Sequence, residues 1–394
     1  MIITFLKIDN LYGFKNTELD MSYSRKVANN TIPNEYLADR PSFNFKRVCI
    51  ISGTNASGKT SLGRVICGLE NFIARKNIIS SLSAAICDKN IPASIEVEFV
   101  TPSNNTFHRL ELLFIDSSVA IRRLLYISHP IGLKDSCYSM RNKINLIKNR
   151  GRTLKGCYIN SDLSSVSEAF EQFSSQHISD MAWMFMFSEN RNEDRISSDN
   201  IISDNIFERI LKTFDSSIFS VESVSSSKNK KIISGYVIKF HNGDSVLINI
   251  SGEIAGDQES ITRFSKGTYD AIKLTSFISR VISEQKLGHS CTHFLDEQMA
   301  YSHSHLEQHI LNLIIDKLSP TSQFFYTTHN YDVLDMGLPV HSFLFMKKKN
   351  NFTSIIQPEK TFNKNDRNLS NYVKNDYFNT LPDTSKIDHM IWDI

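Results

Sequence analysis

The segment Gly53–Ser61, with the sequence GTNASGKTS, fits the phosphate-binding pattern G-x-x-x-x-G-K-[ST] without a substitution. The short apolar run Arg47–Ile51 before it is typical of a buried strand. After the loop, apolar residues repeat at helical spacing, namely Leu62, Val65, Ile66, Leu69 and Phe72. A strand, a glycine-containing loop and a helix in this order bind an anion through backbone N–H groups and the helix dipole. We therefore expect a phosphate site here; the alternative is a glycine-rich turn that binds nothing.

Residue types within this loop suit a nucleotide with bound Mg²⁺. Lys59 would contact the β- and γ-phosphates, and the Thr60 hydroxyl would coordinate the metal. The glycines supply the backbone freedom that the turn requires. The residues expected to contact the nucleotide are Gly53, Asn55, Ser57, Gly58, Lys59, Thr60 and Ser61.

Two acidic residues end a second apolar strand pattern, Thr292–Glu297. In a parallel sheet, the acid that orders Mg²⁺ belongs at the carboxyl end of a strand, and Asp296 fits this position. Glu297 would lie beside the γ-phosphate and act as the general base on the attacking water. The alternative is that both acids only cap a loop. A capping box at Ser304 and Glu307 would begin the next helix.

His329 follows another strand pattern, Gln323–Thr328. An imidazole there would hydrogen-bond the γ-phosphate or position the water, although a lone histidine after a strand often has a structural role. The order of signals along the chain favours the catalytic role. This order is the phosphate loop, a Ser-x-Gly helix start at Ser265–Gly267, an apolar strand ending in Asp-Glu, and Thr-Thr-His.

These motifs together resemble those of ABC-type ATPases of the SMC, RecF and OLD-like group. Gly53–Thr60 corresponds to Walker A, Ser265–Thr268 to a degenerate signature motif, Phe294–Glu297 to Walker B, and Thr328-His329 to the switch histidine. The resemblance implies an α/β fold, namely a P-loop NTPase with an ABC-type head. Such a head has a mixed sheet core and an antiparallel β subdomain, here with a helical insertion.

The resemblance also implies a catalytic site shared between two chains, with ATP and Mg²⁺ as cofactors. Two heads would sandwich two ATP molecules, and the Ser265 and Gly267 region of one head would contact the γ-phosphate bound by the other. Lys59, Glu297 and His329 would catalyse slow hydrolysis of ATP to ADP and phosphate. The alternative for Ser265–Thr268 is an ordinary helix N-cap.

The glutamine that senses Mg²⁺ in related ATPases is not located by the sequence. Gln172 and Gln176 are candidates, and each is equally a solvated helix residue. Both lie in Val166–Phe187, where the apolar spacing predicts a helix.

Composition shifts divide the chain into three expected parts. Residues 1–127 form a first ATPase lobe with the Walker A motif and antiparallel strands, including a meander over residues 93–127. Residues 128–229 are polar, serine-rich and expected to be a mainly helical insertion. Residues 230–394 form a second lobe with the signature-like motif, Walker B and the switch histidine.

Basic residues cluster in the insertion, with no acid between them. Such a cluster would bind nucleic-acid phosphates, or it is a solvated loop. The whole chain has 44 Lys plus Arg against 42 Asp plus Glu, so net charge alone does not recruit nucleic acid. The cluster consists of Arg141, Lys143, Lys148, Arg150, Arg152 and Lys155.

The remaining composition predicts a cytoplasmic protein with no membrane segment. The 6 cysteines contain no C-x-x-C pair and are expected to be reduced thiols. No apolar run approaches the length of a membrane span, and the start of the chain lacks a targeting pattern.

Only residues 330–394 follow His329, too few for the Toprim nuclease of the OLD family, so no nuclease activity is expected. The chain is similar to stand-alone, AAA-type ATP-binding proteins of bacterial anti-phage defence systems. That likeness implies a homo-oligomer that controls a separate nuclease or toxin. The alternative is a RecF-like DNA-binding repair or loading ATPase.

Overall fold

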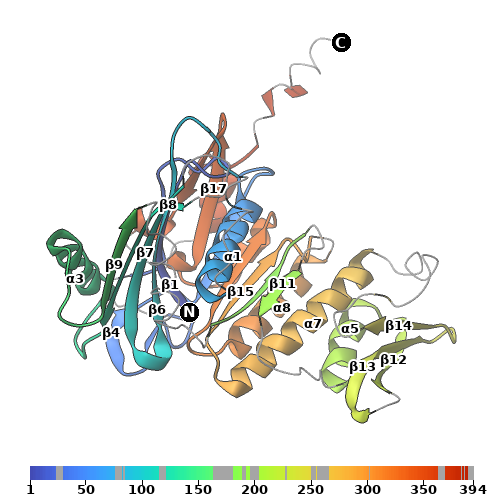
Figure 1. Ribbon diagram of the computed structural model, residues 1–394. Helices are drawn as coiled ribbons and strands as arrows, with labels where there is room; N and C mark the ends of the chain where they lie inside the picture. Colours follow the sequence, from blue (N-terminus) through green and yellow to red (C-terminus); the bar gives the residue numbers. More distant parts are fainter. Residues whose placement is uncertain are drawn as a thin grey trace.

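The protein is described from a computed structural model of its 394 residues (Figure 1). The description covers all residues except 24–29, 76–81, 83–84, 115–120, 163–180, 189–191, 196–203, 227–228, 250–253, 255–265, 301, 363–368, 383, 386 and 389–394.

A seven-stranded sheet forms the centre of the molecule, in the order β11-β10-β15-β16-β5-β17-β18. The strands from β10 to β17 in this order run parallel, and β11 and β18 pair antiparallel at the two edges. The bounds are β11 Asn192–Arg195, β10 Ala182–Met186, β15 Cys291–Asp296, β16 Gln323–Thr328, β5 Val48–Gly53, β17 Phe343–Lys349 and β18 Phe352–Ile356.

Helices cover both faces of this sheet because its central strands are apolar on both sides. On β5, Cys49 and Ile51 pack in the same core cluster as α1 (Lys59–Arg75). Val48 and Ile50 pack in a second cluster with α7 (Lys266–Leu287) and α8 (Ser304–Lys317). The strand that precedes the phosphate loop is therefore buried between two helical layers.

A second sheet of six strands is antiparallel, in the order β2-β1-β6-β7-β8-β9. It confirms the meander expected over residues 93–127, and α3 (Cys137–Arg150) lies on its outer side (Figure 1). Its other side packs against α1 in the first core cluster. The bounds are β1 Ile2–Asp9, β2 Thr17–Asp20, β6 Ala93–Thr101, β7 Thr106–Phe114, β8 Ile121–Pro130 and β9 Cys157–Asp162.

Two smaller sheets, the helices α5 and α9 and several short 3₁₀ helices complete the described elements. The larger of the two, β12-β13-β14, packs with α5 (Asp204–Phe214) and with Ala271 and Ile272 of α7. In Figure 1 this unit lies at the opposite end of the molecule from α3. The bounds are β12 Ile218–Ser226, β13 Asn229–Phe240, β14 Ser245–Asn249, β3 Tyr36–Leu37, β4 Arg40–Asn44 and α9 Leu369–Lys374.

The expected α/β class, with a mixed sheet core and an antiparallel β subdomain, is confirmed. The helix expected over Val166–Phe187 is wrong at its C-terminal end, because Ala182–Met186 is the buried strand β10. A continuous apolar run of this length suits a strand buried on both faces. Elsewhere in residues 128–229 the described part holds α3 and α5 as well as strands, and the domain boundaries stay a prediction.

None of the 6 cysteines forms a disulfide. No described helix has the length and apolar character needed to cross a bilayer. Among the described residues, no group of three or more His, Cys, Asp and Glu side chains has the geometry of a metal site.

Candidate nucleotide-binding site

The phosphate loop connects β5 to α1, as predicted. Gly53 ends β5, and a Cβ at this position would lie 2.2 Å from the carbonyl oxygen of Met346, so a larger residue does not fit. Ala56 and Gly58 have φ angles of 59° and 104°, the left-handed backbone that a sharp loop requires. The loop thereby directs the N-terminus of α1, with its unpaired backbone N–H groups, to the carboxyl end of the sheet.

The side chain of Lys59 is held by hydrogen bonds to the phosphate loop itself. Its side chain is buried, and Nζ donates to the carbonyl oxygens of Gly53 at 3.0 Å and Thr54 at 3.2 Å. The same Nζ lies 3.2 Å from Oε1 of Glu297. Burial lowers the pKa of Lys59, and the Glu297 carboxylate opposes this shift by favouring the ammonium.

Asp296, at the end of β15, is fully buried and accepts hydrogen bonds from hydroxyl groups of neighbouring elements. Thr60 and Ser188 donate to Oδ2 at 2.8 Å and 3.1 Å, and Thr327 donates to Oδ1 at 2.6 Å. The structure therefore brings together Thr60 and Asp296, the two predicted Mg²⁺ ligands. A carboxylate and hydroxyl oxygens in contact are the hard donors that Mg²⁺ requires.

Ser188 was missed by the sequence reasoning. It follows β10, the parallel neighbour of β15, and this places its hydroxyl beside Asp296. Because a helix was expected over this segment, nothing singled out Ser188. Interpreting the apolar run Ala182–Met186 as a strand would have placed Ser188 just after the end of a strand. Gln172 and Gln176, the candidates for the Mg²⁺-sensing glutamine, lie outside the described residues.

Glu297 contacts both other predicted catalytic residues. Its Oε1 lies 2.8 Å from Nε2 of His329 and 3.2 Å from Nζ of Lys59. The backbone of Glu297 is in the left-handed region, with φ of 50°, and its N–H donates to Oγ1 of Thr327 at 3.1 Å. The hydrogen bond with His329 lowers the pKa of Glu297, and the charge of Lys59 acts in the same direction. The carboxylate is therefore ionised at neutral pH, as a general base must be.

The turn that carries His329 is fixed by Glu307, whose contacts the sequence did not predict. The buried carboxylate accepts from Tyr326 Oη at 2.6 Å, from Thr328 Oγ1 at 2.9 Å and from Asn330 Nδ2 at 2.7 Å. These groups lie on both sides of His329 in the chain. The expected capping box is wrong: the N-cap of α8 is His303, and Glu307 points to β16 instead.

The other residues of the loop that are expected to contact the nucleotide differ in burial. Asn55 is exposed at the loop tip, and Ser61 is partly exposed in the first turn of α1. Ser57 is buried, and its hydroxyl has no hydrogen-bond partner among the described groups. Leaving such a hydroxyl unpaired costs about 1–3 kcal/mol, so a phosphate oxygen would be a favourable acceptor for it. The residues present therefore fit a bound nucleotide.

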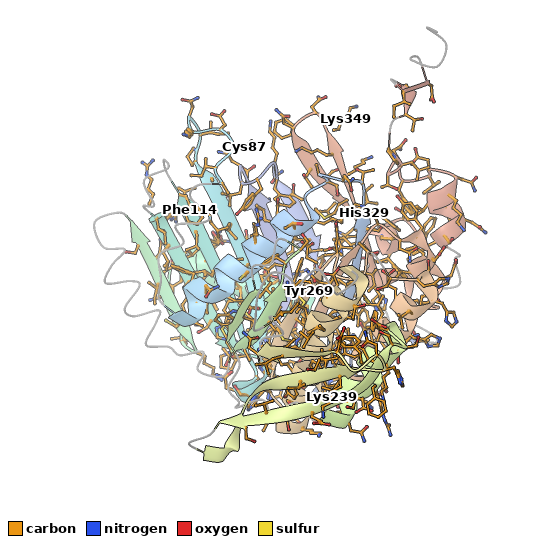
Figure 2. All side chains as sticks on the ribbon, turned by 90° about the vertical axis from the view of Figure 1, so that its right-hand side faces the viewer. Cys87, Phe114, Lys239, Tyr269, His329 and Lys349 are labelled. Atoms are coloured by element: carbon orange, nitrogen blue, oxygen red, sulfur yellow. The ribbon has the colours of Figure 1, made fainter. Side chains whose placement is uncertain are left out.

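The signature-like motif is only partly within the described residues. Ser265 lies outside the described residues, and Gly267 is in the first turn of α7. Thr268 in that turn donates to Asp215 at 2.9 Å, and α7 begins against the three-stranded sheet. Figure 2 shows Tyr269 of this turn apart from His329.

The sequence matches no protein-family model and no curated protein. Solved structures with a similar course of the chain include SMC head domains. One is an SmcHead bound to the C-winged helix domain of ScpA, with 11% identity, coverage of 92% of this chain and 99% of that chain, and a TM-score of 0.46. A second, from Pyrococcus yayanosii, has 8% identity, coverage of 90% and 97%, and a TM-score of 0.49. A third, from Thermotoga maritima, has 13% identity, coverage of 91% and 99%, and a TM-score of 0.39. With these TM-scores below 0.5, the fold assignment rests on the strand order and the phosphate loop.

Proposed function

We propose that the protein binds Mg-ATP and hydrolyses it slowly. The observation that carries this proposal is the convergence of Lys59, Thr60, Asp296, Glu297 and His329 at the carboxyl ends of β5, β15 and β16. Positioning and charge stabilisation are the main demands of phosphoryl transfer, and these side chains supply both.

Each side chain has a distinct part in the proposed reaction. Lys59 neutralises charge on the β- and γ-phosphates, and Thr60 with Asp296 holds the metal. Glu297 accepts a proton from the attacking water, and His329 orients the Glu297 carboxylate through its 2.8 Å contact. Mg²⁺, when bound, neutralises developing charge on the phosphate oxygens.

A head-to-head dimer would complete this site. The support is that Gly267 lies at the start of α7, whose Ala271 and Ile272 pack with the three-stranded sheet in a core cluster separate from that of α1. A helix N-terminus from a second chain would bring N–H groups and a favourable dipole to the γ-phosphate. Homodimerisation, or a higher assembly, should therefore depend on ATP.

Replacing Lys59 by alanine tests the nucleotide-binding proposal. We expect Lys59→Ala to abolish measurable Mg-ATP binding in isothermal titration calorimetry, because the variant loses the only cation now placed over the loop carbonyls among the described residues. Lys212→Ala is the matched control, since this lysine is exposed and pairs only locally with Glu208. Unchanged ATP affinity in Lys59→Ala would refute the assignment.

As a biological role we propose a regulatory ATPase of a bacterial anti-phage defence system that controls a separate nuclease or toxin. The support is the motif resemblance together with the lack of a metal-binding acid cluster in the described part of the chain. Co-purification with the products of neighbouring genes tests it: a nuclease or toxin that is released or activated on ATP hydrolysis is expected. Co-elution of replication or repair proteins alone would contradict it.

The RecF-like alternative depends on the basic cluster of residues 141–155. Arg141, Lys143 and Lys148 of this cluster form ion pairs with acids of the same chain. Charges neutralised in this way contribute little to phosphate binding, which leaves Arg150, Arg152 and Lys155 as the residues of the cluster that would support this alternative.

A further inference from the structure

Helix α3 is firmly attached to the antiparallel sheet along one face. Cys137, Met140, Ile144 and Ile147 are buried in a cluster that also contains Phe107 of β7. Its ends are well formed: Ser136 makes a capping box at the start, and Gly151 in the left-handed conformation (φ 65°) closes the end. The opposite face of the helix is thereby held rigidly toward solvent.

The basic residues on the flanks of α3 pair with acids of the sheet or of the segment just before the helix. Arg141 pairs with Glu98 at 2.5 Å and with Asp20 at 2.9 Å. Lys143 pairs with Asp135 at 2.6 Å. Lys148 likewise pairs with Glu111 of β7 at 2.6 Å. The pairs of Arg141 and Lys148 stabilise the attachment of α3 to the sheet, and all three basic residues are paired away from the middle of its outward face.

Two large apolar side chains lie on this outward face. Tyr138 is 70% exposed and Leu146 is 54% exposed. They are eight residues apart, which is about 12 Å along the helix axis and about 80° around it, and the exposed Asn142 lies between them. Leu133 just before the helix is 72% exposed, and Leu154 just after it is fully exposed. Single exposed apolar residues are ordinary, but two of them on a rigid helix and one beside each of its ends favour an interaction surface.

The charges that border these apolar side chains are all positive. Lys134 lies beside the start of the helix, and Arg150, Arg152 and Lys155 lie at or beside its end. Each is exposed, and the described residues provide no acidic partner within salt-bridge distance for any of the four. We refer to Leu133, Tyr138, Leu146 and Leu154 with these four cations as the α3 face.

We propose that the α3 face binds an acidic amphipathic helical segment of a partner protein. Apolar side chains of such a segment would pack between Tyr138 and Leu146, and its carboxylates would meet the cations at either end. A second copy of this chain fits less well. A two-fold, antiparallel pairing of α3 helices would set Lys134 of one copy against Arg150 and Arg152 of the other, which repel. Figure 1 shows α3 outside the antiparallel sheet and α1 on its inner side, so the partner would leave the phosphate loop accessible.

Fluorescence anisotropy with the full-length protein tests this proposal. The probe is a labelled 18-residue peptide with leucines at helical spacing and glutamates on its flanks. The comparison probes are the same peptide with lysines in place of glutamates, a 20-nucleotide single-stranded DNA, and vesicles of anionic phospholipid. We expect the acidic peptide to bind at least about tenfold more tightly than each comparison probe, as charge complementarity favours it.

Two sets of variants locate the binding. Tyr138→Ser with Leu146→Ser, and separately Arg150→Glu with Arg152→Glu and Lys155→Glu, should each weaken acidic-peptide binding about tenfold or more. The matched apolar control is Phe219→Ser with Leu247→Ser, at exposed positions on the three-stranded sheet. Circular dichroism verifies that each variant is folded, and the exposed positions make this the expected result.

The outcomes that overturn the proposal are distinct from one another. Equal or tighter binding of DNA would assign the α3 face to nucleic acid, and equal binding of vesicles would assign it to a membrane surface. A concentration-dependent dimer that the Tyr138 and Leu146 changes abolish would assign it to a second copy. Lack of binding by the acidic peptide, or binding unaffected by the α3 variants, would also refute it. ATP binding enters none of these readouts, so the proposal stands or falls independently of the proposed ATPase.

Discussion

The phosphate loop and the basic cluster of residues 141–155 both present cations without acids nearby in the sequence, yet they differ in how those cations are paired. Lys59 meets Glu297, a carboxylate that is 27% exposed and that His329 also contacts. Arg141 meets Glu98, which is 1% exposed and shared with Arg109 at 2.5 Å. The first pair lies at the carboxyl ends of the central strands, where Glu297 is partly exposed, and the second is enclosed.

This difference separates the proposed catalytic site from a structural one. A buried carboxylate shared by two guanidinium groups has its lone pairs occupied, and replacing its partners by water is unfavourable. A partly exposed carboxylate on a strained turn exchanges partners at lower cost. A lysine or arginine that binds phosphate therefore needs a carboxylate partner that can be displaced. The sequence alone does not show whether the partner of a basic residue is exposed and displaceable or buried and fixed.

The largest expected effect is at the pair of Lys59 and Glu297. Glu297→Gln should reduce kcat for ATP hydrolysis by about 10²–10⁴-fold, the usual contribution of a general base. ATP affinity should rise, since the neutral amide no longer competes with phosphate for Lys59. Single-turnover hydrolysis and calorimetry measure the two effects. Hydrolysis at the wild-type rate would show that Glu297 is not the base, and Glu222→Gln, at an exposed acid of β12, is the control.

Removal of the enclosed carboxylate, Glu98, should lower stability and leave nucleotide binding unchanged. Glu98→Ala leaves Arg109 and Arg141 without their shared acceptor and should lower the free energy of unfolding by about 3–5 kcal/mol. Mg-ATP affinity should not change. Urea denaturation followed by circular dichroism measures the first effect, and calorimetry at a temperature where the variant is folded measures the second. A loss of ATP affinity with intact stability would break the contrast between the two regions.

Glu70 of α1 sharpens the contrast, as it is a fully buried carboxyl without an arginine or lysine partner among the described residues. Burial raises its pKa from 4.5 to about 7, opposed by the N-terminal ammonium and the Thr292 hydroxyl. Between these pH values the folded state binds more protons than the unfolded state, so stability should fall as pH rises from 4.5 to 7 and then level off.

The size of this effect is about 3 kcal/mol, and Glu70→Gln should remove most of it. Denaturation curves at pH 5 and pH 8 for the wild type and the variant test the prediction. If the stability of the wild type and that of Glu70→Gln change equally between pH 5 and pH 8, the Glu70 carboxyl has a partner that compensates for its burial.

The smallest expected effect is at the rim of the enclosed region. Lys148 is 40% exposed and pairs with Glu111 at 2.6 Å, so Lys148→Ala should change the free energy of unfolding by less than about 1 kcal/mol. Thermal denaturation at low and high salt measures it. A larger loss that persists at high salt would mean that this surface pair belongs to the buried network.

The site residues that the sequence predicted are those in local motifs. Gly53, Lys59 and Asp296 could be identified because a loop pattern or a strand end fixes each within a few residues. Ser188 and the pairing of Arg141 could not, because they depend on which distant segments meet. Arg141 lies 121 positions from Asp20 and 43 from Glu98. Periodicity also failed at β10, where an apolar run suits a buried helix and a buried strand equally.

The position of β5 in the central sheet has a consequence for synthesis of the protein. β5 lies between β16 and β17, so its neighbours are made nearly 300 residues after it. At about 5–20 residues per second, the ribosome takes roughly 15–60 s to add them. During that interval the phosphate loop lacks both adjacent strands, and Lys59 lacks Glu297 and His329. The proposed nucleotide binding should therefore begin only after β17 has been made, and a chain that ends before β16 would hold the phosphate loop without binding nucleotide.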